Sequence, residues 1–561
     1  MNKILLVSLL LISGASIADQ PRMAAVASAH PLATDAAIEI LQQGGNAFDA
    51  AAAISAALTV VDPSGSGLGG GGFWLLHRES DGKDVMIDGR EKAPEFAHAR
   101  MYLDEKDEIK PRMSRDGPMA GGIPGIPAGI IYLATTYGRL PLATSLAPAI
   151  RYAKEGFAIT AGLQDQIDGR ADVLSQYPPA AEIFLPNGKV PEAGDILVQK
   201  DLGNTLQSMA DKGLAGFYYG DMAARIIQGM QQYGGIWSLK DLEQYFVVER
   251  PPMKFTYKDV SVITASLPSS GGVVMAQTLK MLEHFDLDSM DRVSRAHHAI
   301  EALRRAYRDR SLFLGDPDFS TAPLDKLLDP EYIETLTLTI NPDKATPSDD
   351  LADLPGPKQS GESTTHFSII DTEGNRVAGT LSINTSLGSG FVIPGTGVLV
   401  NNEMDDFAIK PDTPNAYGLI GFEANAIVPG KRPLSSMSPT FVESGERVGI
   451  LGTPGGSRII SMVLLGILDF ADGQLPESWV DLPRYHHQYK PDVVQFEAAA
   501  FNEQEQQQLI ARGHEVRVTN RDYGDMHAVM WDKRTGRVYA VADKRGEGSA
   551  RVWQPEVMPA P

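Results

Sequence analysis

The chain has 561 residues, with 71 acidic and 50 basic side chains, a formal net charge of −21 and no cysteine. The acidic balance argues against a nucleic-acid or anionic-membrane partner, because both call for a basic face. The lack of cysteine excludes disulfides, thiolate metal sites and a cysteine nucleophile. A nucleophile therefore has to be Ser, Thr, Lys, a carboxylate or water.

Residues 1–18 have the pattern of a signal peptide. Lys3 precedes an apolar run at 4–12, and Ser16-Ile17-Ala18 places small residues at a cleavage position. The run is too short to span a bilayer, which needs about 20 apolar residues. An uncleaved anchor is the alternative interpretation. We expect a mature chain that starts at residue 19 and is periplasmic or secreted.

The first half of the mature chain is predicted to be mainly helical. Residues 24–60 have helical composition, interrupted by Gly44-Gly45, and Asn46 is suited to cap a second, alanine-rich helix. Strand patterns follow at 73–76 and 85–87, and the region 141–314 is mostly helical. Residues 341–362 are rich in Pro, Asp, Ser and Gly, which is linker composition.

Beyond the linker the pattern changes to strands. They are predicted at 365–370, 377–383, 392–402 and 440–451, with a helix from Gly456 to about residue 470 and hairpin-like alternation over 516–541. A helical part beside many paired strands indicates a layered α+β sandwich rather than alternating βαβ units.

Two motifs invite a functional interpretation that their context does not support. The four glycines at 69–72 are not followed by a Lys-Ser/Thr pair, so a P-loop is excluded and a close approach of backbones is the better interpretation. His486 and His487 are adjacent and lack the carboxylate–histidine spacing of a metal site, which favours structural histidines.

The segment 362–366, Glu-Ser-Thr-Thr-His, lies where the linker ends and a strand begins. β-Propensity alone explains Ser and Thr at such a position. A threonine freed there as a new N-terminus would carry a hydroxyl and an α-amine on one residue. The amine, with an ordinary pKa of about 8, can act as general base to the hydroxyl. The composition permits this chemistry without requiring it.

Nine motifs, in order along nearly the whole mature chain, make the sequence resemble the γ-glutamyltranspeptidases, or glutathione hydrolases. They are GSGLGGGGF at 65–73, DGREKAP at 88–94, PSSGGV at 268–273, DRSLFLGDPDF at 309–319, TTHFS at 364–368, NNEMDDF at 401–407, KRPLSSMSPT at 431–440, GTPGGSR at 452–458 and RYHHQ at 484–488. One such motif would be weak, but the ordered set is specific.

The resemblance implies an α+β N-terminal-nucleophile hydrolase, a four-layer αββα sandwich. It also implies a proenzyme that cuts itself between Ser363 and Thr364 into a large subunit, 19–363, and a small subunit, 364–561. The two subunits stay together as a heterodimer and form one catalytic domain. Thr364 is then the nucleophile, first for self-cleavage and afterwards for attack on the γ-glutamyl carbonyl.

Further roles are carried over residue by residue. Gly455 and Gly456 match the oxyanion hole of the family, where unhindered backbone N–H groups are needed; a helix-entry turn is the alternative. Arg90 matches the clamp on the substrate α-carboxylate, which its planar fork fits in bidentate fashion. Ser435 and Ser436 match positions that hydrogen-bond the same carboxylate. Without the resemblance these would be a surface arginine and a turn.

Other residues match those that bind the positively charged α-ammonium group of the substrate in the family. Glu403, Asp406 and Asn384 resemble the group that holds the α-ammonium; some bacterial relatives carry Gln in place of Glu403. Ser382 stands where many relatives have Thr, and its hydroxyl is expected to contact the nucleophile. Residues 412–425 resemble the lid loop, with Tyr417 closing over the glutamyl pocket. The alternatives are an ordinary acidic surface and a mobile loop.

The implied activity is transfer or hydrolysis of the γ-glutamyl group of glutathione and similar amides, with amino acids, dipeptides or water as acceptors. No cofactor and no metal is implied. A related glutaryl (cephalosporin) acylase is the alternative enzyme. An exported solute-binding protein is the alternative of another class; it predicts an uncut chain with two lobes.

Overall fold

The computed structural model describes residues 20–351 and 364–555. The predicted signal peptide, residues 1–18, and Ser363 at the predicted cleavage bond lie outside the described residues. Among the described helices, none combines the length and apolar composition that a bilayer span requires.

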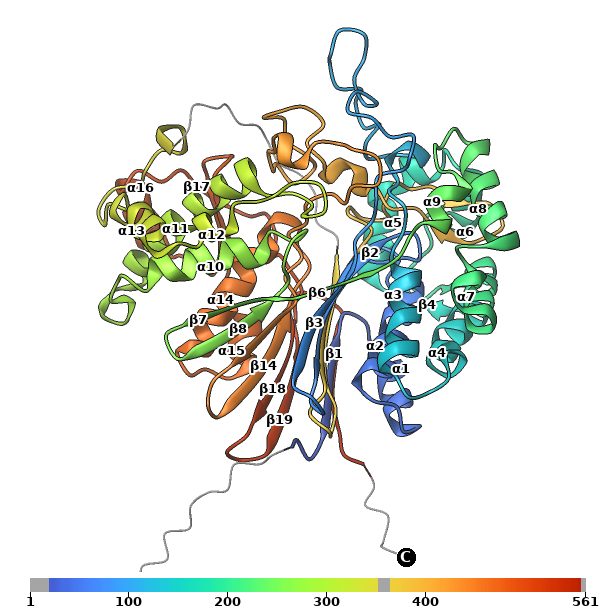
Figure 1. The fold of residues 1–561 in the computed structure, drawn as a ribbon, viewed down its shortest axis with the longest axis horizontal. Helices are drawn as coiled ribbons and strands as arrows, with labels where there is room; N and C mark the ends of the chain where they lie inside the picture. The colour runs from blue at the N-terminus through green and yellow to red at the C-terminus, as the bar shows by residue number, and fades with distance from the viewer. Residues whose placement is uncertain (1–19, 352–363, 556–561) are drawn as a thin grey trace, which may run out of the picture.

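Two antiparallel sheets form the centre of the molecule (Figure 1). The first runs in the order β20 (Ser549–Trp553), β1 (Ala24–Ser28), β9 (Thr365–Ile370), β10 (Arg376–Ser382), β2 (Gly71–Arg78), β3 (Lys83–Gly89) and β6 (Val248–Arg250). The second runs in the order β19 (Arg537–Ala542), β18 (His527–Asp532), β14 (Arg447–Gly452), β13 (Thr440–Glu443), β8 (Val260–Thr264) and β7 (Met253–Tyr257).

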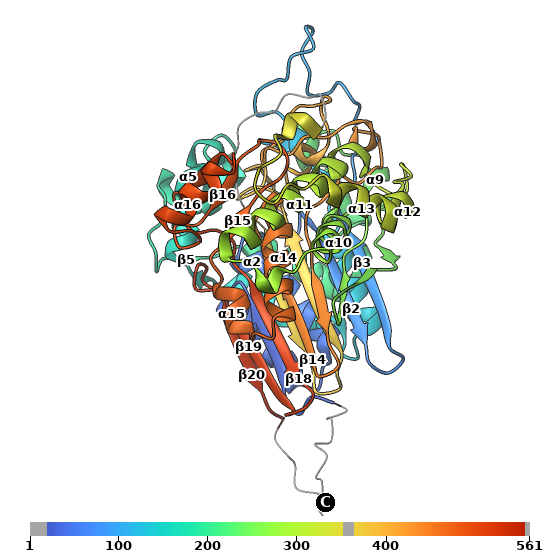
Figure 2. The ribbon, with the colours of Figure 1, turned by 90° about the vertical axis from the view of Figure 1, so that its left-hand side faces the viewer.

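Helices gather on the outer side of each sheet (Figure 1). Beside the first sheet lie α1 (Pro31–Gln42), α2 (Ala47–Val61), α3 (Ile126–Tyr132), α4 (Leu142–Glu155), α5 (Ala161–Leu174), α6 (Pro178–Phe184), α7 (Lys200–Lys212), α8 (Gly220–Gln232) and α9 (Leu239–Glu243). Beside the second lie α10 (Gly271–Leu282), α11 (Arg292–Phe313), α12 (Leu324–Leu327), α13 (Pro330–Leu338), α14 (Ile459–Ala471), α15 (Pro476–Asp481) and α16 (Glu503–Ala511). Figure 2 looks through α10, α14 and α15 onto the second sheet.

Short strands complete the described secondary structure. They are β4 (Phe157–Ala158), β5 (Ile196–Leu197), β11 (Val392–Ile393), β12 (Val398–Leu399), β15 (Tyr485–His486), β16 (Val494–Phe496) and β17 (Val516–Val518). The strand predicted over 392–402 is therefore only the small β11–β12 hairpin.

Alternation along the strands accounts for the four layers. Ala24 and Val26 of β1 belong to the core beneath the first helical layer, whereas Ala25 and Ala27 face the core between the sheets. In β18, Val529 faces that same inter-sheet core, and its neighbours turn toward the second helical layer. Because successive side chains of a strand point to opposite faces, each sheet is apolar on both faces and is covered on both. The predicted αββα sandwich is confirmed.

The local predictions for the first elements hold with one correction. Asn46 caps α2 through a capping box with Asp49, as its position before the alanine-rich run predicted. Residues 24–28, however, form strand β1 and not a helix, although alanine favours helices. The reason is tertiary: β1 pairs with β20 on one side and β9 on the other, and both partners are remote in sequence.

The two predicted subunits share both sheets. Strands β9 and β10, from beyond the linker, lie between β1 and β2 from before it. In the second sheet, β13 and β14 pair onward from β8. Cleavage of the linker would leave these ladders intact, so the two pieces would remain one folded unit.

Candidate active site

Thr364 directly precedes β9, and its side chain is largely buried, with 8% of the residue exposed. In the ladder between β9 and β10, Leu381 lies opposite Thr365, so the next residues, Ser382 and Thr364, meet at the end of the ladder. The two hydroxyl oxygens are 3.5 Å apart, and Ser382 Oγ accepts a hydrogen bond from the Asn384 N–H at 2.8 Å. The predicted contact between Ser382 and the nucleophile is therefore a consequence of sheet register.

A small, enclosed cavity opens beside the Thr364 hydroxyl. The space inside is about 20 Å³, close to the room one water molecule needs. It is lined by Thr364, Ser382, Asn384, Glu403, Asp406, Tyr417, Ser435, Ser436 and Gly456, together with Leu419, Met437 and Ile459. The structure thus brings to one place the residues that the sequence singled out; Arg90 lies directly behind the cavity wall, and Gly455 lies next to Gly456.

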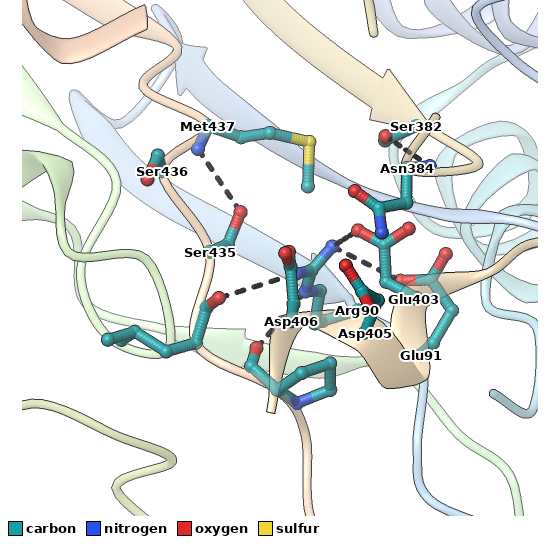
Figure 3. Close-up of polar contacts among 12 residues, drawn as sticks. Arg90, Glu91, Ser382, Asn384, Glu403, Asp405, Asp406, Ser435, Ser436 and Met437 are labelled. Carbon is teal, nitrogen blue, oxygen red and sulfur yellow. Dashed lines mark hydrogen bonds and ion pairs between the residues drawn. The ribbon is translucent and has the colours of Figure 1, made fainter. Parts of the chain in front are cut away.

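Arg90 follows β3 and is almost fully buried, with 1% exposed. Its guanidinium donates to Asp406 Oδ2 at 2.7 Å, to Glu403, and to the Pro433 carbonyl at 3.1 Å (Figure 3). The family resemblance predicts that Arg90 and the two carboxylates bind opposite ends of a substrate. In the structure they form one ion-pair network.

The protonation of this network is set by burial and by the arginine. Burial raises the pKa of Glu403 to about 7, against the opposing effect of Arg90. Burial also raises the pKa of Asp406, and that of Glu91 well above its ordinary value. Burial by itself would lower the pKa of Arg90, but the Glu403, Glu91 and Asp406 carboxylates outweigh it and raise that pKa. Arg90 is therefore always charged, and Glu403 is the group that changes charge near neutral pH.

Ser435 and Ser436 lie on a loop held from behind. The Ser435 carbonyl accepts hydrogen bonds from the N–H and the hydroxyl of Ser270, at 2.8 Å and 2.7 Å, and Ser435 Oγ accepts from the Met437 N–H at 3.1 Å. Ser436 Oγ accepts from Arg310 at 3.4 Å. Both serines line the cavity.

Gly455 and Gly456 have backbone conformations that favour glycine, with φ of 140° and 56°. A Cβ atom at Gly456 would lie 2.3 Å from the Tyr417 ring, and one at Gly455 would lie 2.6 Å from Met462 Cε. The pair leads through a 3₁₀ turn (Gly456–Arg458) into α14. Backbone N–H groups at a helix N-terminus favour developing negative charge, as an oxyanion hole requires.

Tyr417 belongs to the predicted lid, residues 412–425. Its hydroxyl donates to the Asn384 carbonyl at 2.6 Å, and its own carbonyl accepts from Gln488 at 3.1 Å. The residue is only 6% exposed. Tyr417 therefore lies against both the Gly456 turn and Asn384 and forms part of the cavity wall.

A second, larger cavity of about 280 Å³ meets Thr364 from another direction. Gly455 lines it as well, together with Asp62, Ser64, Gly65, His30, Arg521, Asp525 and Arg545. Asp62 Oδ2 and the Thr364 carbonyl both lie within 3.2 Å of the point that a Cβ of Gly65 would occupy. The sequence analysis did not single out Asp62, which is one acidic residue among many and has no local signal.

The two motifs set aside earlier have structural roles. A Cβ at Gly69 would lie 2.0 Å from the Leu399 carbonyl, and one at Gly70 would lie 2.1 Å from that of Ser382. Gly69 therefore allows the backbone to pack against β12, and Gly70 allows it to pack against β10, which carries Ser382. His486 bonds to Ser461 and Gln488, and His487 to Asp492. Within residues 20–351 and 364–555, no cluster of three His, Asp or Glu side chains has metal-site geometry.

Comparison with known proteins identifies the family of the chain. The family model described as Gamma-glutamyltranspeptidase matches residues 33–553. The chain belongs to the γ-glutamyltranspeptidase family. It is 42% identical to a glutathione hydrolase proenzyme of Pseudomonas sp. (strain A14), over 87% of this chain and 85% of that protein, and 39% identical to one of Escherichia coli (strain K12), over 93% and 90%.

The structural comparison agrees on the fold. The crystal structure of a cephalosporin acylase from Bacillus halodurans superposes with a TM-score of 0.84 at 27% identity, covering 98% of this chain and 99% of that one. The γ-glutamyltranspeptidase family therefore shares its architecture with acylases, so the fold alone does not distinguish γ-glutamyl transfer from acylase activity. The residues that line the cavity have to distinguish them. One sandwich with two stacked sheets also differs from the two lobes expected of a solute-binding protein.

The Gly456→Ala variant tests the oxyanion turn. The added methyl would meet the Tyr417 ring and strain a positive φ, so we expect kcat/KM to fall by about 100-fold or more. Gly473→Ala is the control, because Gly473 also has a positive φ of 87° but has nothing within 4 Å of its Cβ position. Full activity in Gly456→Ala would contradict the assignment.

The pH profile tests Glu403. A carboxylate attracts the substrate ammonium only when ionised, so wild-type kcat/KM should fall as the pH drops below about 7, the pKa of Glu403. Glu403→Gln keeps a hydrogen-bond acceptor but cannot titrate, so the decline below about pH 7 should become shallower and only the decline caused by protonation of the Thr364 α-amine should remain. An unchanged steepness in Glu403→Gln would assign the second ionisation to another group.

Proposed function

We propose that the protein is a γ-glutamyltransferase and glutathione hydrolase that acts through a γ-glutamyl–threonine intermediate. The observation that carries the proposal is the cavity beside the Thr364 hydroxyl, which is lined by two carboxylates that both pair with the buried Arg90. Such a cavity is complementary to a small zwitterion, the α-amino-acid end of a γ-glutamyl group. The Tyr417 side chain, which lines the cavity, favours a single glutamyl unit over a polymer.

The proposed reaction has two steps. Thr364 Oγ1 attacks the γ-carbonyl carbon, the C–N bond of the amide breaks, and the hydroxyl proton passes through the α-amine of Thr364 to the leaving amine. The N–H groups of Gly455 and Gly456 stabilise the oxyanion. Water or an acceptor amine then attacks the ester, and its proton returns to Thr364 Oγ1 as glutamate or the new γ-glutamyl amide leaves.

The second cavity supports a place for the acceptor. This larger cavity is lined by Thr364 and Gly455, whereas the smaller cavity beside the Thr364 hydroxyl is lined by Thr364 and Gly456. An acyl group seated between the two glycines would have its leaving side toward the larger space. We assign that space to cysteinylglycine as it leaves and to amino-acid or dipeptide acceptors as they enter.

Thr364 can supply an α-amine only as a chain end, so the proposal requires maturation. The precursor is proposed to cut itself between Ser363 and Thr364, giving subunits 19–363 and 364–561 that stay associated through the shared sheets. We propose export through removal of residues 1–18, which places the enzyme in the periplasm or outside the cell.

Purified wild type should therefore contain two fragments, and N-terminal sequencing should find them to begin at Asp19 and Thr364. Thr364→Ala should remain one chain, because the attacking hydroxyl is gone. Thr365→Ala is the matched control, since it removes the neighbouring hydroxyl and should still cleave. A fully active, uncut wild type would contradict the proposal.

The two carboxylates of the cavity argue against the alternative activity, that of a glutaryl acylase. A glutaryl substrate lacks the α-ammonium, so Glu403 and Asp406 would share Arg90 as their cation and gain no second one. Sites built around a substrate polar group reject analogues without it by roughly 10⁴-fold. Nothing in the cavity favours the glutaryl substrate.

Matched p-nitroanilides test this choice. The wild type should cleave γ-glutamyl-p-nitroanilide and nearly ignore glutaryl-p-nitroanilide. Asp406→Ala should lose most γ-glutamyl activity and show a smaller preference, because it removes one acceptor of the ammonium. Comparable wild-type kcat/KM values for the two substrates would overturn the choice of function.

A further inference from the structure

Arg310 of α11 is a buried arginine whose charge no carboxylate neutralises by contact. Only 4% of the residue is exposed. Its Nε donates to Ser270 Oγ at 2.9 Å and its Nη2 to Ser436 Oγ at 3.4 Å. Among the described residues, no Asp or Glu oxygen lies within ion-pair distance of it. Burial lowers the pKa of Arg310, and Tyr307 and Asp406 oppose that effect.

The neighbouring arginines of the same helix are paired. Arg305 Nη1 is 2.8 Å from Glu301, and Arg304 Nε is 3.2 Å from the same carboxylate. Taking an unpaired charge out of water is expensive, so buried charges in proteins are normally paired. Arg310 is an exception to this pattern. It contacts Ser436, which lines the cavity.

Arg90 is poorly placed to bind a carboxylate by itself. Its guanidinium is already paired with Glu403 and Asp406, and the Glu91 carboxylate is 3.5 Å away. An incoming carboxylate would therefore meet an arginine surrounded by negative groups. A second cation near the cavity would restore the charge balance, and Arg310 is placed to act as one because, like Arg90, it interacts electrostatically with Asp406.

We propose that Arg310 is a positioning residue for the α-carboxylate of the substrate, acting through the hydroxyl of Ser436 and through Ser270, which holds Ser435. Its positive charge makes the serine side of the cavity attractive to an anion, while the carboxylates around Arg90 receive the ammonium. This inference rests on the proposed function and adds a residue that selects the acid form of the substrate.

A pair of substrates separates this role from a purely structural one. One is γ-glutamyl-p-nitroanilide, and the other is its α-carboxamide, which has the same shape without the negative charge. The ratio of the two kcat/KM values does not depend on the fraction of folded enzyme, so a poorly folding variant can still be measured. Wild type should prefer the acid.

In Arg310→Gln the preference for the acid should fall by about 10- to 100-fold, because a hydrogen-bonded charge contact is lost for the acid alone. The loss should appear mainly in KM. Arg310→Lys keeps the charge and should recover part of the preference. Arg308→Gln is the matched control on α11; Arg308 contacts Asp309 and the Leu351 carbonyl, and its ratio should equal that of the wild type.

An unchanged ratio in Arg310→Gln, or an equal loss on both substrates, would overturn the inference and leave the proposed function standing. A wild type that cleaves neither substrate would overturn the proposed function and this inference with it.

Discussion

Strand β9 occupies the middle of the first sheet, and the catalytic geometry depends on that placement. Its pairing with β10 brings Ser382 to Thr364, and its pairing with β1 ties the residues after the linker to residues 25–28. The glycines of β2 and of the loop before it let the neighbouring backbone approach β10 closely. A shift of one residue in this register would turn the side chains to the other face.

Around this fixed point, the cavity is built from opposite charges that offset one another. The ion pairs of Arg90 with Glu403 and Asp406 compensate the cost of burying the arginine charge. The same ion pairs compensate the cost of burying the two carboxylates. The raised pKa values of Glu91 and Glu403 favour their neutral, protonated forms, and this reduces the remaining excess of negative charge. Arg310 lies behind Ser436, and no carboxylate of the described residues is in contact with it. A small zwitterion is the ligand whose two charges such an arrangement complements.

Much of the local structure could be predicted from the sequence. The capping box at Asn46, the β9–β10 hairpin and the helix after Gly456 all arise from residues close together in the chain. Strand β1 was misread because its alanines favour a helix locally, whereas its partners lie at positions 367–370 and 549–553. Pairing between distant segments leaves no local pattern from which to predict it.

An ordered set of motifs in the sequence identifies the family and, with it, most of the residues that line the cavity. How the charges of these residues pair follows only from the folded chain. Sequence spacing places Glu403 and Asp406 near each other, but their contact with Arg90 crosses more than 300 positions. In the same way, the unpaired charge of Arg310 becomes visible only when burial and every neighbouring carboxylate are known. Electrostatic energy depends on distance and solvent exposure, and both are properties of the folded chain.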